Sequence, residues 1–140
     1  MKNTSHIDYM NLLQCKKKFY LSRKEFQSDG QELFSIICDE ELSVIRSSLR
    51  EKFGDGIEIN SFEAPEKRSE ISLDSCEREH PLIYDAYFNN SQFTTYSDLI
   101  FHEDGKMHVA LFKVSTNVRD MHIDQAAFTK FVLEHHFGLS

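Results

Sequence analysis

Two side chains in the C-terminal half of the chain have types and spacing that could do chemistry. Asp98 lies in the middle of the apolar run 93–101, and Lys113 lies in the next run, 107–115. A carboxylate can ligate Mg²⁺, although a single one rarely holds the ion without substrate phosphates. A lysine among apolar residues needs water or a charged partner, because an unpaired buried ammonium is costly. We therefore expect Asp98 and Lys113 to lie within about 4 Å as an ion pair, directly or through one water.

A second carboxylate near Asp98 would strengthen the case for a metal. Asp85 is the first candidate, since the run 82–88 that carries it should form an adjacent strand. Asp120 and Asp124 are a weaker alternative, one helical turn apart and therefore on the same helix face. Carboxylates in such positions also serve structural networks, so both interpretations stay open.

Zinc and disulfide chemistry are not expected. The three cysteines form no C-x-x-C pair, and their number is odd. The histidines of the second half are scattered, without the short convergent spacing of a zinc site. They include His102, His108 and His122, with His135 and His136 at the end of the last predicted helix.

Strands and a helix must position these side chains. The runs 82–88, 93–101 and 107–115 predict three adjacent strands, the last two pairing antiparallel across a polar turn that contains Gly105. Apolar residues then recur every four positions, which predicts a helix at about 120–136.

The N-terminal half predicts more helices. Helical spacing indicates helices at about 5–20 and 31–52, and alternation indicates a strand over 57–62. Pro65 begins a highly charged helix, 66–79, that we expect to be largely exposed. Together these elements predict one domain, 1–140, of the α/β (α+β) class, with a central mixed sheet of about four strands flanked by helices.

Composition restricts the function classes. The formal net charge of −7 argues against a protein that grips nucleic acid over a wide surface, although a small basic groove remains compatible with it. No apolar run reaches the ~18–20 residues of a membrane span, and the first residues lead into no signal-peptide core. A cytoplasmic protein without a membrane partner is expected, and the sequence does not set its oligomeric state.

Six segments together resemble the PD-(D/E)XK nuclease superfamily, in particular a RecB-type branch of bacterial nuclease-like proteins. The resemblance spans nearly the whole chain, and the order and spacing of the segments carry it. They are 12–21 (LLQCKKKFYL), 52–59 (KFGDGIEI), 83–88 (IYDAYF), 97–100 (SDLI), 111–116 (LFKVST) and 120–122 (DMH) with 127–128 (AF). The resemblance implies a restriction-endonuclease-like core.

The resemblance also assigns roles and exposes departures. In the family an Asp and a Glu hold Mg²⁺, and a Lys two positions after the Glu assists the attacking water; the Asp and Lys match Asp98 and Lys113. Leu111 stands where the family has the Glu. The family's helix Asp and Gln fall on Gln125 and Thr129, and no cysteine cluster for an iron–sulfur centre follows.

Two hypotheses follow. The first is a degenerate domain that has lost the metal-binding Glu, keeps Asp98 and Lys113 as vestiges, needs no cofactor, and binds a protein or a nucleic acid. The second is a small DNA nuclease dependent on Mg²⁺ or Mn²⁺, with a relocated acid at Asp85, Asp120 or Asp124 beside Asp98. A second carboxylate near Asp98 is the feature that separates them.

Overall fold

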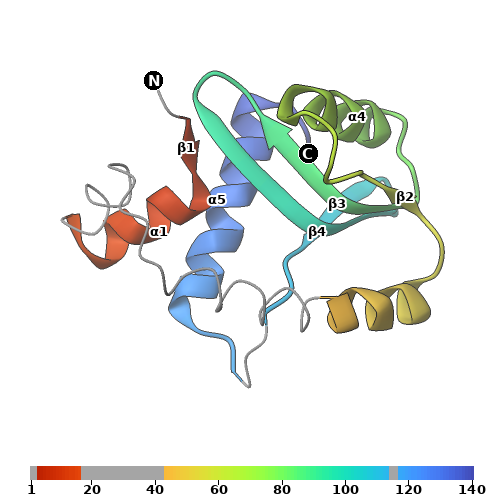
Figure 1. The fold of residues 1–140 in the computed structure, drawn as a ribbon, viewed down its shortest axis with the longest axis horizontal. Helices are drawn as coiled ribbons and strands as arrows, with labels where there is room; N and C mark the ends of the chain where they lie inside the picture. Colours follow the sequence, from red (N-terminus) through yellow and green to blue (C-terminus); the bar gives the residue numbers. More distant parts are fainter. Residues whose placement is uncertain (1–2, 17–42, 114–116) are drawn as a thin grey trace.

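The computed structural model describes residues 3–16, 43–113 and 117–140 (Figure 1). Besides a helix over residues 43–53, these residues form the following elements: β1 (Thr4–Ser5), α1 (His6–Gln14), β2 (Ile57–Glu58), α4 (Pro65–Glu77), β3 (Leu82–Asn89), β4 (Phe93–Glu103), β5 (Lys106–Ala110) and α5 (Asp120–His136).

The strands form one mixed sheet in the order β1-β4-β3-β2, with β5 also paired to β4. β4 runs antiparallel to both β3 and β5, with Ile83 opposite Ile100 and Leu99 opposite Ala110. β1 and β2 pair in parallel, with β4 and β3 respectively. The predicted α/β class and the antiparallel group are confirmed. The described part has five strands, the sequence having given no sign of the two-residue β1.

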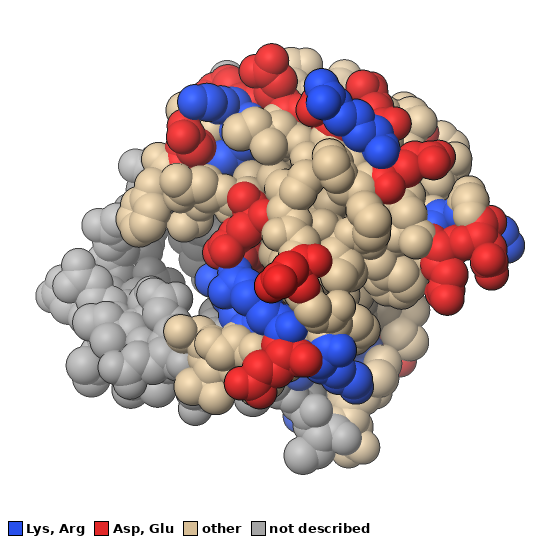
Figure 2. All heavy atoms as spheres, turned by 90° about the vertical axis from the view of Figure 1, so that its right-hand side faces the viewer, with Lys and Arg blue, Asp and Glu red and all other residues tan. Residues whose placement is uncertain are grey.

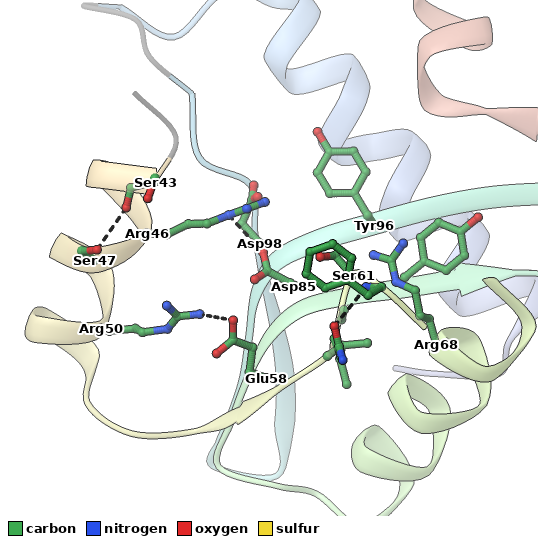
Figure 3. A pocket seen from close by; sticks show the side chains of 15 residues that line it. Ser43, Arg46, Ser47, Arg50, Glu58, Ser61, Arg68, Asp85, Tyr96 and Asp98 are labelled. Carbon is green, nitrogen blue, oxygen red and sulfur yellow. Dashed lines mark hydrogen bonds and ion pairs between the residues drawn. The ribbon is translucent and has the colours of Figure 1, made fainter. Parts of the chain in front are cut away.

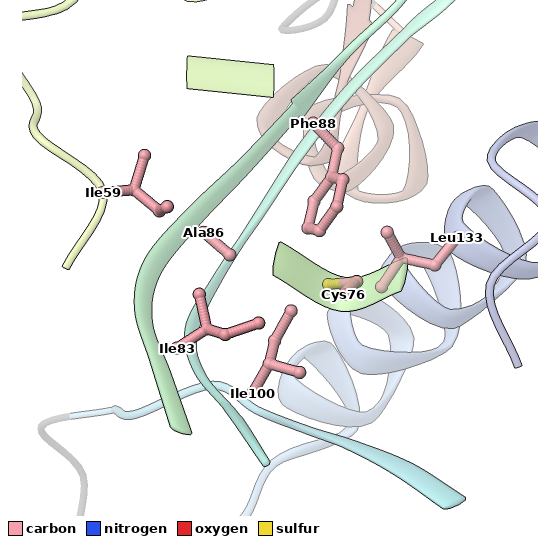
Figure 4. Packing of buried hydrophobic residues seen from close by; sticks show 7 residues of the cluster. All are labelled: Ile59, Cys76, Ile83, Ala86, Phe88, Ile100 and Leu133. Carbon is pink, nitrogen blue, oxygen red and sulfur yellow. The ribbon is translucent and has the colours of Figure 1, made fainter. Parts of the chain in front are cut away.

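The core lies between the sheet and the helices α4 and α5, with Cys76 contributed by α4 (Figure 4). Ile83, Phe88 and Ile100 of the strands pack with Leu133 of α5, and each is at most 1% exposed. The helix occupies the predicted 120–136, and it buries a stripe repeated every three to four residues. Because this buried stripe faces the sheet, α5 packs across one face of the sheet.

Ser5 caps the N-terminus of α1. Ser5 and Asp8 form a capping box, in which each side chain accepts a hydrogen bond from the other residue's backbone N–H. The helix ends at Gln14, and the rest of the predicted 5–20 helix falls mostly outside the described residues. Tyr9 stacks on Phe128 with ring centroids 5.1 Å apart, so α1 is held against α5.

The prediction that α4 is largely exposed is wrong for one face of the helix. Its serines Ser69, Ser72 and Ser75 are at most 4% exposed, where the sequence predicts a largely exposed helix. β2 pairs with β3 only as far as Tyr84, which leaves later amides of β3 without a strand partner. The Tyr87 N–H donates to Ser72 Oγ at 2.9 Å, and the Asn89 N–H donates to Ser69 Oγ at 2.9 Å. Serine hydroxyls thus replace a strand at this sheet edge.

Two strands are shorter than predicted. β2 stops before Asn60, whose side chain accepts the N–H of Phe62 in a tight turn. β5 ends at Ala110, where the sequence predicts strand as far as 115. The predicted 31–52 helix is seen only from residue 43, because the preceding residues lie outside the described part. None of the helices described is long and apolar enough to cross a membrane.

Candidate functional site

The backbone of β3 departs from regular strand geometry at Asp85, where φ is 56°. Ile83, Ala86 and Phe88 belong to the core cluster, whereas the side chains of Tyr84 and Tyr87 contact groups outside it. The strict alternation of a strand is therefore broken at this residue. A left-handed conformation is strained for most side chains and is least costly for Asn, Asp and Gly. Strain of this kind in a strand is typical of functional positions.

Asp98 stands opposite Asp85 on the neighbouring strand. The β3–β4 register pairs Tyr84 with Leu99 and Ala86 with Ser97, which leaves the two aspartates facing each other between these pairs. Burial raises the pKa of both carboxyls, and the charge of Asp98 raises the pKa of Asp85 further. The sequence candidate Asp85 is thus brought to Asp98.

The two aspartates line a hollow of about 750 Å³ (Figure 3). Arg46 and Arg50 reach it from the 43–53 helix, and Arg68 reaches it from α4 on the other side. Its other lining residues include Glu58, Asn60, Ser61, Phe62, Tyr87 and Tyr96. We call this space the arginine-lined hollow.

Two carboxylates of this hollow form ion pairs with arginines of the chain. Arg46 Nε lies 3.3 Å from Asp85 Oδ1, and the positive charge of Arg46 lowers the pKa of both Asp85 and Asp98. Arg50 forms an ion pair with Glu58. The sequence does not predict that these arginines lie at the site. Its only signal is the i, i+4 spacing of Arg46 and Arg50, which places the two on one face of a helix.

Asp98 and Lys113 do not form the predicted direct ion pair. Asp98 Oδ2 accepts the backbone N–H of Phe112 at 2.8 Å, and no Lys113–Asp98 contact within 4.0 Å is present between these two described residues. The charge of Lys113 still lowers the pKa of Asp98, so the lysine is near enough to act electrostatically. The physical reason is the β4–β5 register, in which Leu99 pairs with Ala110. Continued past the end of β5, this register would put Leu111 opposite Asp98 and Lys113 opposite Tyr96.

Leu111 lies in a different environment from Asp98. It lines a second hollow of about 450 Å³ between β5 and α5, together with Val109, Ile123 and Leu133. Phe112, one position later, is the residue that lies beside Asp98. The position that the resemblance equates with the metal-binding Glu therefore does not line the arginine-lined hollow.

The α5 acids and Gln125 are placed differently from one another. Asp120 and Asp124 lie in the first turns of α5, and neither lines the arginine-lined hollow. Gln125 is 5% exposed and donates from Nε2 to the Tyr96 hydroxyl at 3.3 Å. In the sequence, Gln125 is notable only because it stands where the family has an Asp. The position of Gln125 in the sequence does not predict its hydrogen bond to Tyr96.

His6 completes the surroundings of Tyr96. Its ring meets the Tyr96 ring edge-on, with centroids 4.6 Å apart. Burial, together with the positive charge of Lys113, lowers the pKa of His6 to about 4. The imidazole is therefore neutral near pH 7, with one ring nitrogen able to donate a hydrogen bond and the other able to accept one.

Within the described ranges, no group of three or more His, Cys, Asp or Glu side chains is arranged to hold a metal ion. Comparison of the chain with known protein families, with curated proteins and with solved structures finds no match. The resemblance to the PD-(D/E)XK superfamily therefore stays a prediction from the sequence motifs.

Proposed function

We propose that this chain is a non-catalytic domain of the PD-(D/E)XK kind, which binds a partner at the arginine-lined hollow. One observation carries the proposal: Asp85, the carboxylate that stands opposite Asp98, is ion-paired with Arg46. In a metal-dependent nuclease these two acids would have to face a cation. Here a guanidinium of the chain takes that place.

The residues present do not fit a Mg²⁺ site of the family's kind. Mg²⁺ demands octahedral oxygen ligands, and it is bound through carboxylates together with water and phosphate oxygens. Asp98 commits one oxygen to the Phe112 N–H, Arg46 would repel a cation, and Leu111 lines another hollow. The same groups suit an anionic or polar partner.

A Mg²⁺-dependent DNA nuclease remains the second candidate, on one specific observation. Asp85 and Asp98 face each other across adjacent strands, as two metal-binding acids would. For this candidate Asp85 takes the role of the missing Glu, and Asp120 and Asp124 do not contribute to the hollow.

The first prediction tests the two candidates directly. Wild-type protein and Asp98→Asn, purified side by side, are incubated with single-stranded and duplex DNA in Mg²⁺ or Mn²⁺. We expect no cleavage above that of Asp98→Asn, because a phosphodiester needs a metal to activate water and to neutralise charge. Gel analysis of the DNA gives the measurement.

Two outcomes would overturn non-catalysis. Cleavage by wild type that disappears in both Asp98→Asn and Asp85→Asn would establish the nuclease with the relocated acid Asp85. Cleavage that disappears in Asp98→Asn and persists in Asp85→Asn would place the second acid elsewhere, and Asp120 and Asp124 would then be changed next.

A further inference from the structure

The three arginines of the arginine-lined hollow are not equivalent. Arg46 is paired with Asp85 and Arg50 with Glu58, whereas Arg68 has no carboxylate partner among the residues described. Its guanidinium lies over the ring of Tyr87, 4.3 Å from the centroid, which fixes the plane of the group. Within the described part of the chain, Arg68 is therefore a positioned cation without a counter-ion.

Hydrogen bonding at Arg68 is also incomplete. The Nε atom is buried and has no acceptor among the residues that the structure describes. Buried donors without partners are rare in folded proteins, and each one calls for an explanation. A planar guanidinium presents its N–H groups in a fork that matches the oxygens of a phosphate or a carboxylate. Because Nε itself is closed to solvent, an oxyanion in the hollow would bind the other N–H groups of this fork.

The position of charges selects the Arg68 end of the hollow for an anion. Asp85, Asp98 and Glu58 lie with Arg46 and Arg50, and their negative charge opposes an anion there. Figure 3 shows Arg68 reaching in from α4, on the opposite side of the hollow from the 43–53 helix. Tyr96 also lines the hollow, while its hydroxyl accepts a hydrogen bond from Gln125 of α5 and points away from Arg68 (Figure 3).

An aromatic ring lies at the mouth of the same hollow. Phe62 lines it and is 97% exposed, in the turn that follows β2. A phenylalanine so exposed gains nothing from the fold, and an apolar or planar ligand group would cover it. The hollow thus combines a site for an oxyanion at Arg68 with a surface for a planar ring at Phe62, and it is large enough for one small ligand to contact both.

We propose that the Arg68 end of the arginine-lined hollow binds the phosphate of a small phosphorylated ligand whose planar ring packs on Phe62. This inference rests on the proposed function, because it names the chemistry of the partner that the non-catalytic domain binds. Adenosine 5′-monophosphate is a suitable probe, with adenosine, ribose 5-phosphate and inorganic phosphate as its parts.

The second prediction is a calorimetric titration of these probes against wild type, Arg68→Gln and Arg78→Gln. Arg78 is the matched control, since it lies just after α4, is 69% exposed and pairs with Asp74 away from the hollow. We expect adenosine 5′-monophosphate to bind tighter than any of its parts. Arg68→Gln should weaken it about tenfold or more, the worth of one charge-assisted hydrogen bond. Arg78→Gln should change it less than about twofold.

Phe62→Ala separates the two halves of the site, since it should weaken the nucleotide and leave ribose 5-phosphate unchanged. Equal affinities of wild type and Arg68→Gln would overturn the proposal, as would the absence of nucleotide binding. A short oligothymidylate that binds through Arg68 while the mononucleotide does not would also overturn it, and would assign the site to polynucleotide phosphate. None of these results depends on cleavage, so the DNA assay tests the non-catalytic function separately.

Discussion

Asp85 is the residue at which backbone strain and charge meet. Its φ of 56° lies where most side chains pay a steric cost, and its carboxylate is held by Arg46. Strain of this sort persists only where the surrounding structure enforces it, and here both neighbouring residues, Tyr84 and Ala86, are locked in the β3–β4 ladder. The conformation therefore brings the carboxylate to the hollow at some cost in stability.

The third prediction compares Asp85→Gly with Asp85→Ala. Both remove the carboxylate and its ion pair, so they differ only in what the backbone tolerates. Glycine adopts positive φ freely, and alanine does not. We expect Asp85→Gly to be more stable than Asp85→Ala by about 1 kcal/mol in the free energy of unfolding, measured by urea denaturation. The reverse order, as found in a regular strand, would mean that residue 85 does not hold this conformation.

For Asp98, the sequence predicts that Asp85 lies nearby, but it predicts neither the hydrogen bond that Asp98 accepts nor the arginine beside the two acids. Asp85 could be placed on the adjacent strand because both runs are apolar and separated by a short turn. The Phe112 N–H and Arg46 could not be predicted, since each depends on where β5 ends and on the packing of a distant helix. A lysine at 113 reads as a strand residue, and only the structure shows that the strand stops three residues earlier.

Among the elements, α4 departs furthest from its sequence pattern. Hydrophobic periodicity predicts an exposed helix because serine counts as polar, yet its serines satisfy the open edge of β3. The long strands and α5 were predictable because each has a clear period and a recognisable turn or cap. β1 was not, since two residues carry no period at all.

The fourth prediction concerns the serine edge. Ser72→Ala should cost about 1–3 kcal/mol of unfolding free energy, because it leaves the buried N–H of Tyr87 without an acceptor. Ser75→Ala is the matched control: Ser75 is equally buried and donates to the carbonyl of Ile71, yet no strand amide depends on it. Urea denaturation of both variants gives the comparison. If the two cost the same, the strand amide of Tyr87 has another acceptor.

At the scale of the molecular surface, charge is dispersed on the face that Figure 2 shows. Figure 2 shows Lys and Arg interleaved with Asp and Glu on one face, without a broad basic surface. With a formal net charge of −7, such a surface does not favour capture of the nucleic-acid backbone. The arginines of the hollow act locally, over the few ångströms that a small ligand spans.

The fifth prediction concerns the pH dependence of the whole fold. His6 has a pKa of about 4 when folded against 6.5 as the ordinary value, so between these values the unfolded chain binds a proton that the folded chain does not. Stability should therefore fall as the pH drops from 7 toward 4. We expect a shallower fall from pH 7 to pH 5 in His6→Gln than in wild type, measured by urea denaturation. His135→Gln, at an exposed position, serves as the surface control.

An equal pH dependence in wild type and His6→Gln would contradict this prediction. Asp85 and Asp98 act in the opposite sense, because their raised pKa values let the folded chain keep protons at higher pH than the unfolded chain. Their contribution is present in both proteins, and so it cancels in the comparison.

The pairing of β1 with β4 has a consequence for how the chain folds. Asn3 donates to the Asn89 side chain across 86 residues, whereas α4, β3, β4 and β5 follow one another closely in sequence. Nearby contacts form before distant ones, because closing a long loop must precede any reward from its contacts. We therefore expect β1 to join β4 after β3, β4 and β5 have paired. During synthesis β1 emerges before β4, so this strand partner is absent until β4 has been made.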